Sequence, residues 1–344
     1  MNKISLLLIC FFFTACNSIT DPIKMDDDLN AKPIALSGFD LDLFRAECAL
    51  VDGNVILSPF SVSNVTKMVL AAAYGDTEEE ILNAYQNKTK SELLQSNKSL
   101  MAQVNALDSN LLTCVNTFYY DKSKITVDSE FETHLNEYFN ASGNGRDFSD
   151  LQATLDAING WCHQNTNGRI PKILDDISSD EIMFLLNAIY LKASWASPFD
   201  PNSTRDADFT LKNGQKVTAS YMFQDNRFNH AQYQNAEMME LPYSDEELSL
   251  CLIKPKDVDI DHYISGFDKT TLDSLLANRQ KKRYMLHVPK FTVEYENKNM
   301  KPTFGLMGIN KMFTPTAELN LSTPSNTMVS RIVHKTYFSI DEKG

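Results

Sequence analysis

The sequence has no extended basic run and carries little positive charge for its length. Its 344 residues include 32 Lys and Arg against 45 Asp and Glu, a formal net charge of −13, and no basic run exceeds Lys281-Lys282-Arg283. Nucleic-acid-binding proteins neutralise phosphates with a clustered basic face, which this sequence does not offer. We therefore expect no nucleic-acid partner, and the acidic balance favours solubility outside the cell.

The motifs of several common enzyme classes are also missing. The sequence contains no P-loop, no glycine-rich dinucleotide-binding motif and no His-Glu-x-x-His metal motif. Ser58 does not lie in a Gly-x-Ser-x-Gly sequence, which the nucleophile elbow of the α/β-hydrolases requires. We therefore expect no enzymatic activity and no cofactor.

Cysteines are few and scattered through the main part of the chain. They are Cys48, Cys114, Cys162 and Cys251, and they form no Cys-x-x-Cys pair and no Cys/His cluster. Zinc sites need closely spaced ligands, and disulfide-dependent domains are small and rich in cysteine. We expect no metal site and four singly buried cysteines, and the sequence leaves their disulfide state open.

The N-terminal apolar run, residues 4–13, is too short to anchor the chain by spanning a bilayer. Lys3 precedes this run and small residues follow it, an order that is typical of a secretory signal. The ending Phe13-Thr14-Ala15-Cys16 resembles the lipobox of bacterial lipoproteins, in which the cysteine is lipidated. We expect residues 1–15 to be a signal peptide and Cys16 to carry the lipid. The lipid would then be the protein's contact with an extracytoplasmic bacterial membrane. The alternative is an ordinary signal peptide and a secreted protein.

A polar tether and one long domain follow the signal. Residues 16–33 are polar and include Asp26-Asp27-Asp28, and residues 34–344 are expected to form the domain. From apolar periodicity and a proline suited to a first helical turn, helices are expected over 36–50, over 151–166 and from Ser58-Pro59 onward. Strands are expected over 111–120, 183–191, 286–295 and 331–340, with a hairpin turn at Asn213-Gly214. The sum is one α+β body.

Six stretches, in order along the domain, carry a family resemblance. They are NVILSPFS at 54–61; INGW at 158–161 with TNGRI at 166–170; LNAIYLK at 186–192 with Trp195, PFDP at 198–201 and Thr204; HVPKF at 287–291; MGINKMF at 307–313; and VHKT at 333–336 with DEKG at 341–344. Together they resemble the serpin family of protease inhibitors. The resemblance implies the serpin fold, which is α+β with a large central sheet and smaller sheets. It also implies a monomer whose partner is a target protease of the serine or cysteine class.

The resemblance assigns roles to two groups of residues. It implies a buried polar network beneath the centre of the main sheet, called the shutter, made of Ser58, Ser61, Asn187 and His334. Such a network must open before a new strand can enter. From the residues alone, a second interpretation is that Ser58 caps a helix and His334 is a satisfied surface residue.

The second group, called the breach, is implied at the top of the main sheet and consists of Trp195, Thr204, Lys290 and Glu342. An ion pair between Lys290 and Glu342 would hold the sheet closed there, although an exposed pair contributes little by itself. The sequence departs from the family at Ala193, where the family motif Lys-Gly-x-Trp has glycine. Because glycine permits close backbone approach, the local backbone is expected to differ at this point.

The hinge of the reactive loop is expected to start at Glu342-Lys343-Gly344. In the mechanism that the resemblance implies, a protease cleaves the loop beyond this hinge, and the cleaved loop enters the main sheet as an extra strand. The sequence stops at Gly344, so we expect a truncated polypeptide that cannot inhibit by itself. The alternatives are a non-inhibitory serpin-fold lipoprotein that binds other molecules or acts as a chaperone, and a nutrient-binding lipoprotein of another fold.

Overall fold

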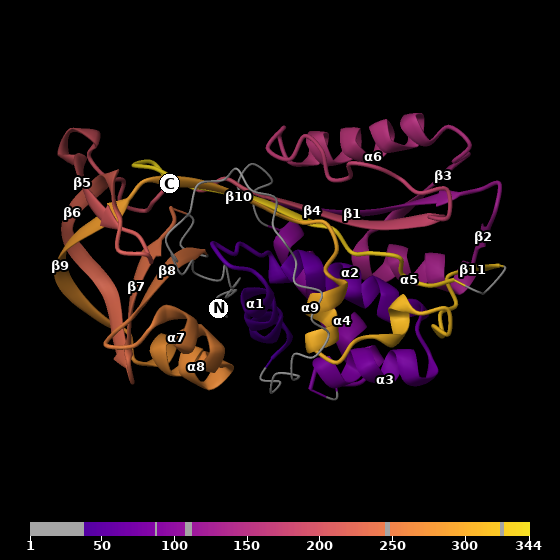
Figure 1. Ribbon diagram of the computed structural model, residues 1–344, viewed down its shortest axis with the longest axis horizontal. Helices are drawn as coiled ribbons and strands as arrows, with labels where there is room; N and C mark the ends of the chain where they lie inside the picture. Colours follow the sequence, from indigo (N-terminus) through magenta and orange to yellow (C-terminus); the bar gives the residue numbers. More distant parts are fainter. Residues whose placement is uncertain (1–37, 87, 107–111, 245–247, 324–326) are drawn as a thin grey trace.

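The computed structural model describes residues 38–86, 88–106, 112–244, 248–323 and 327–344 (Figure 1). The expected signal peptide 1–15, Cys16 and the tether 16–33 lie outside the described residues. The helices are α1 Phe39–Leu50, α2 Pro59–Ala72, α3 Gly75–Ala84, α4 Lys90–Asn105, α5 Ser129–Phe139, α6 Leu151–Asn165, α7 Ile260–Gly266, α8 Lys269–Ala277 and α9 Lys301–Leu306, with short 3-10 helices η1 Pro201–Ser203 and η2 Lys311–Phe313. The strands are β1 Leu112–Asp121, β2 Thr126–Val127, β3 Ser142–Arg146, β4 Met183–Leu191, β5 Arg205–Thr210, β6 Lys216–Tyr233, β7 Ala236–Pro242, β8 Ser249–Pro255, β9 Gln280–Pro289, β10 Phe291–Asn297, β11 Ser322–Thr323 and β12 His334–Ile340.

The central helix of the body is α2, and local sequence explains where it begins. Pro59 occupies its first turn, where a missing N–H costs nothing. The Ser58 hydroxyl caps the helix by accepting a hydrogen bond from the Ser61 N–H at 3.3 Å. Most α2 side chains are buried on every side, as expected for a helix that neighbouring elements surround.

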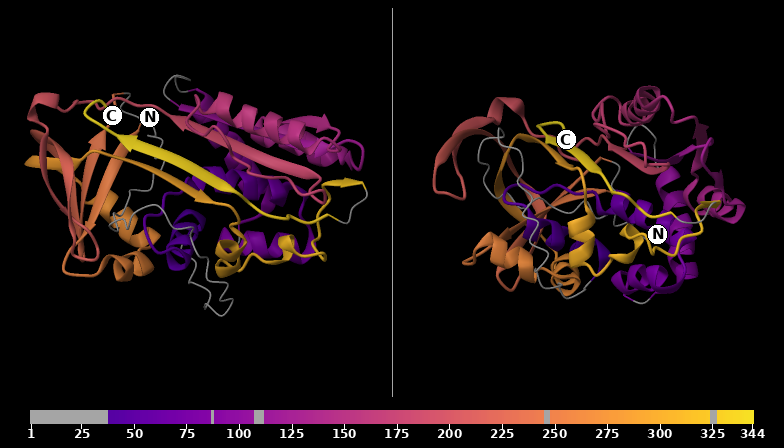
Figure 2. Two further views of the ribbon diagram at one scale, coloured as in Figure 1. Left: turned by 45° about the horizontal axis from the view of Figure 1, so that its top comes forward. Right: turned by 45° about the vertical axis from the view of Figure 1, so that its right-hand side comes forward.

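One layer of the molecule contains two strand ladders. In the first, β1 pairs with β3 in parallel and with β4 in antiparallel orientation, giving the order β3-β1-β4. In the second, β10 and β12 pair in antiparallel register from Phe291↔Ile340 to Asn297↔His334. The layer lies between α6 on one face and a group of helices that includes α2 on the other (Figure 1). Two further views show the same layer from other directions (Figure 2).

A second sheet forms the other end of the molecule. Its strands follow the order β5-β6-β7-β8, and β9 also pairs with the long strand β6. The expected hairpin turn at Asn213-Gly214 is confirmed, because β5 and β6 pair in antiparallel register on either side of it. Gly214 has φ 83°, a conformation that glycine adopts without steric cost. The short strands β2 and β11 make a separate pair.

Three of the apolar clusters among the described residues hold these layers together. The largest packs α2 against α1, α3, α4, α5 and α9 and against Phe118 of β1. A second lies between α6 and the outer face of β1 and β4, with Ile158, Phe184 and Leu186 buried in it. A third joins the second sheet to the end of β12 through Trp195 and Ile340. Both faces of β4 are therefore covered, as its continuous apolar run predicts.

The strand expected over 183–191 has the same bounds as β4, but the single strand expected over 286–295 is wrong. The chain leaves the second sheet at Pro289 and enters the layer with β12 at Phe291, so this stretch contributes to two sheets. The strand expected over 331–340 begins only at His334. The four cysteines of the described domain are free thiols, and only Cys114 and Cys162 are buried as expected, whereas Cys48 and Cys251 are half-buried. Over the described ranges, the structure holds no cluster of candidate metal ligands and no helix long and apolar enough to cross a membrane.

Candidate functional site

The two ladders of the central layer meet without pairing. Among the described residues, β4 has a ladder only with β1, and β12 has one only with β10. Two cavities, of about 290 and 420 Å³, occupy the space between β4 and β12. We call this space the lane. Its lower end lies at Glu181 and Arg331, and its upper end lies at Lys192 and Lys343.

The walls of the lane carry polar groups without partners. The side-chain oxygens Asn187 Oδ1 and Thr327 Oγ1 are buried, line the lane and have no hydrogen-bond partner. Leaving a buried polar group unsatisfied costs about 1–3 kcal/mol. The inner edges of β4 and β12 add backbone N–H and C=O groups that neither ladder uses. The lane is therefore a place where an added polar backbone would gain hydrogen bonds.

Three of the four predicted shutter residues lie together beneath β12. The Ser58 backbone N–H donates to His334 Nε2 at 3.0 Å, and the Ser58 and Ser61 hydroxyls are 3.0 Å apart. His334 is 5% exposed, so the interpretation of it as a surface residue is wrong. Burial lowers its pKa to about 4, so the imidazole is neutral at pH 7 and can accept the Ser58 hydrogen bond. Ser58 is also the cap of α2, so the interpretation of it as a capping residue holds as well.

Asn187, the fourth predicted shutter residue, does not join them. It lies in the middle of β4, across the lane from His334. Its amide donates to Asn116 Oδ1 at 2.8 Å and to the Cys114 sulfur at 3.3 Å. The separation follows from the open lane, since the two walls that carry these residues do not pair. The sequence did not predict Asn116 and Cys114 as neighbours of Asn187, because they belong to β1 and lie about 70 residues earlier in the chain.

All four predicted breach residues meet at the upper end of the lane. Lys290 Nζ is 2.8 Å from Glu342 Oε2, and the Thr204 hydroxyl donates to Glu342 Oε1 at 2.8 Å. The hydrogen bond from Lys290, followed by that from Thr204, holds the pKa of the Glu342 carboxyl below its usual value. Trp195 Nε1 donates to the Asp341 carbonyl at 2.9 Å, and its ring stacks on another aromatic side chain.

The backbone at the predicted hinge packs closely against the segment after β4. The Trp195 N–H donates to the Lys343 carbonyl at 2.8 Å. A Cβ at Gly344 would lie 1.9 Å from the Ala193 carbonyl oxygen, and Gly344 has φ 154°. The glycine that permits close approach is therefore Gly344 on one side of this contact, while Ala193 occupies the family's glycine position on the other.

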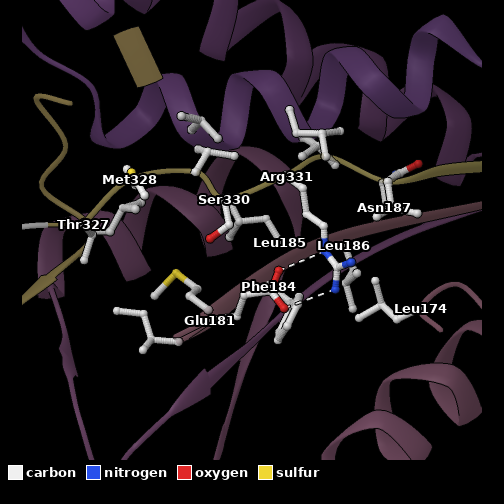
Figure 3. Close-up of a pocket in the computed structure, with 18 of the residues that line it drawn as sticks. Leu174, Glu181, Phe184, Leu185, Leu186, Asn187, Thr327, Met328, Ser330 and Arg331 are labelled. Carbon is white, nitrogen blue, oxygen red and sulfur yellow. Dashed lines mark hydrogen bonds and ion pairs between the residues drawn. The ribbon is translucent and has the colours of Figure 1, made fainter. Parts of the chain in front are cut away.

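The connection between α6 and β4 crosses the lane and was missed from sequence. We call residues 166–177 the strap. Arg331, just before β12, forms an ion pair with Glu181 at 2.9 Å (Figure 3) and a second one with Asp176 of the strap at 2.9 Å. Lys335 Nζ of β12 donates to the Lys172 carbonyl at 2.9 Å, and Lys298 pairs with Asp175. The strap thus joins the two walls, and the contacts that tie it to the β12 side are largely ionic.

The Ser58–His334 contact does not have the geometry of a nucleophile and its base. The hydrogen bond comes from the Ser58 backbone N–H, and the Ser58 hydroxyl is directed to Ser61 instead. An activated serine would place its hydroxyl on the imidazole, with an acid orienting the ring. The described residues therefore assign this pair to α2 capping and to the floor of the lane.

These features define an α+β protein whose central sheet is divided by a lane and closed at its upper end by the breach. The chain belongs to the serpin family: the family model described as "Serpin (serine protease inhibitor)" matches residues 35–344. Many serpins are inhibitors that act on target proteases and are not catalysts. The α+β serpin fold expected from sequence is confirmed.

Three similar proteins come from organisms that are distant from one another. The chain is 30% identical over 302 residues to an uncharacterized serpin-like protein of Methanosarcina acetivorans, covering 85% of this chain and 70% of that protein. It is 30% identical over 330 residues to a leukocyte elastase inhibitor of Xenopus tropicalis, covering 90% and 86%. The crystal structure of Manduca sexta serpin-12 superposes with a TM-score of 0.82 at 27% identity, covering 89% of this chain and 87% of the other.

Proposed function

We propose that this protein is an inhibitor of serine or cysteine endopeptidases that acts by taking a cleaved reactive loop into the lane as an additional strand. The observation that carries the proposal is the unpaired lane between β4 and β12, with the buried side-chain oxygens Asn187 Oδ1 and Thr327 Oγ1 in its walls, neither of which has a hydrogen-bond partner. The loop would extend from the hinge that starts at Glu342, which the breach holds beside Trp195.

Strand entry has a definable energetic basis. Ordering one residue costs about 1–2 kcal/mol of backbone entropy, and one backbone hydrogen bond contributes about 1 kcal/mol net. A strand on a single sheet edge therefore gains little. In the lane, the strand would pair with β4 on one side and β12 on the other, and its side chains would be buried between α2 and the strap. The second ladder and this burial favour insertion.

The proposal is tested first by adding a strand in trans. A neutral, acetylated and amidated peptide of about seven residues, the length of β12, is incubated with the protein. Peptide that occupies the lane is expected to raise the melting temperature, because a ligand at 100 times its Kd stabilises by about 2.7 kcal/mol. A scrambled peptide with proline at alternate positions is the control, since proline cannot donate to a ladder. An unchanged melting temperature with both peptides would contradict strand uptake.

Inhibition is tested with a protein in which a reactive loop follows the hinge at Gly344 in the same chain. Incubated with trypsin, chymotrypsin, elastase, subtilisin and papain, the protein is expected to form a complex with at least one protease that survives boiling in detergent. Cleavage of the loop without such a complex, together with peptide uptake, would instead support a non-inhibitory binding function on the serpin body.

A further inference from the structure

The upper half of the lane is positively charged in an otherwise acidic protein. The charged residues that line the upper cavity are Arg169, Lys192, Lys335, Asp341 and Lys343, so four cations accompany one carboxylate. The whole chain carries a formal charge of −13. The local excess is therefore opposite in sign to the net charge of the whole chain.

Most of this charge is not neutralised within the protein. Lys335 forms an ion pair with Glu296 at 2.8 Å. Arg169 instead lies over the Tyr337 ring, with its guanidinium carbon 5.1 Å from the ring centroid, and Nη1 donates to the Tyr337 hydroxyl at 3.3 Å. Among the described residues, Arg169, Lys192 and Lys343 have no carboxylate within ion-pair distance, and all three are exposed.

The lower half of the lane has a different charge balance. Its charged lining residues are Asp180, Glu181 and Arg331, and Arg331 forms ion pairs with Glu181 (Figure 3) and with Asp176. No free cation is therefore presented by the described lining of the lower cavity. The sign of the available charge changes along the lane, from positive at the upper end to slightly negative at the lower end.

We infer that the lane selects an extended peptide with carboxylate side chains in the half that occupies the upper cavity. Both walls run upward, since the lower cavity contacts residues 181–187 and 327–334 and the upper cavity contacts residues 187–194 and 333–341. A strand that pairs in antiparallel orientation with both walls has its N-terminal half in the upper cavity, and antiparallel pairing is the more stable kind. The acidic residues therefore belong in the N-terminal half of the peptide. This inference rests on the proposed function, because both require the lane to admit a strand.

The test compares three peptides that differ only in charge. They are Ac-Thr-Glu-Ala-Glu-Ala-Val-Ala-amide and its analogues with Gln or Lys in place of both Glu residues. An exposed ion pair changes affinity by up to about fivefold, and salt screens it. The Glu peptide is expected to bind about three- to tenfold more tightly than the Gln peptide at low ionic strength, and the Lys peptide more weakly than either. The Glu preference should shrink at 0.5 M salt.

Matched variants locate the effect. Lys192→Gln and Lys343→Gln are each expected to reduce the preference for Glu over Gln by about two- to threefold. Lys301→Gln, which removes the same charge from an exposed position at the start of α9, outside the lane, should leave the preference unchanged. Two separate lane variants are used so that the test still stands if one of them misfolds. A melting curve of each variant shows whether it is folded.

The outcomes separate the two proposals. Equal binding of all three peptides would overturn charge selection and leave strand uptake standing. No binding of any peptide would overturn both. An equal loss in Lys301→Gln would show a general charge effect and overturn the assignment to the upper lane. A dimer that forms without peptide and dissociates on peptide addition would identify a second copy as the occupant and contradict an acidic peptide.

Discussion

His334 illustrates how burial alone can set the chemistry of a residue. It is 5% exposed, and its environment lowers the imidazole pKa to about 4, whereas an unfolded histidine titrates near 6.5. Between these values the unfolded chain binds more protons than the folded one. Stability therefore rises with pH through this window, is fully present above about pH 6.5 and is lost as the pH falls toward 4.

We predict that acidification from pH 7 to pH 4.5 lowers the free energy of unfolding by about 2 kcal/mol through this residue alone. His334→Gln retains an acceptor for the Ser58 N–H but does not titrate. Urea unfolding at a series of pH values should show a shallower acid dependence for the variant. Parallel curves for wild type and variant would contradict a neutral, buried His334.

Removing polar groups from two side chains in the walls of the lane, Asn187 and Thr327, is expected to have different effects on stability. Asn187→Ala would leave Asn116 Oδ1 without the donor that lies 2.8 Å away, at a cost of about 1–3 kcal/mol in stability. Thr327→Val would remove a buried hydroxyl that has no partner, so stability should be unchanged or slightly higher. Both effects are measured from the midpoint of urea unfolding. A loss in Thr327→Val as large as that in Asn187→Ala would contradict this hydrogen-bond assignment.

At the scale of elements, the breach joins the end of β9 to the end of β12. Glu342 is buried and accepts hydrogen bonds from Lys290 and Thr204. Glu342→Gln keeps an amide oxygen for Thr204 but removes the charge that Lys290 faces. We predict a coupling of about 1 kcal/mol in unfolding free energy between Lys290 and Glu342, measured in a double-mutant cycle with Lys290→Gln.

The same variant tests whether the breach restrains the lane. We expect Glu342→Gln to take up the neutral peptide about three- to tenfold faster than wild type. An uptake rate equal to wild type would show that the breach does not restrain the lane.

The sequence predicted β4 to the residue, because a continuous apolar run needs burial on both faces and has only a few ways to achieve it. It predicted one strand over 286–295, but the chain changes sheets after Pro289, where the apolar positions change from even to odd residue numbers. The family resemblance identified residues that the structure brings together at the breach. It placed Asn187 with His334, whereas the open lane separates them. The strap was missed because ion pairs such as Asp176–Arg331 join segments about 150 residues apart and leave no local pattern.

At the scale of the whole molecule, we propose that the N-terminus determines where the protein acts. Residues 1–16 resemble a lipoprotein signal, and we propose that lipid on Cys16 holds the domain on an extracytoplasmic bacterial membrane, with residues 17–33 as a tether. Cys16→Ala is expected to move the protein from the membrane fraction to the soluble fraction. The matched control is Cys48→Ala, which removes a cysteine of the folded domain instead. Membrane retention of Cys16→Ala equal to wild type would contradict the anchor.

The unpaired inner edges of β4 and β12 also make hydrogen–deuterium exchange a measure of whether the lane is empty or filled. Alternate backbone amides on these edges have no ladder partner, so their hydrogens should exchange with deuterated water far sooner than those shared with β1 and β10. A strand in the lane would protect them, and their exchange would slow together along both walls. The mass of two short peptides, one from each wall, would then report the fraction of molecules whose lane is filled, without a fluorescent tag or a known target protease.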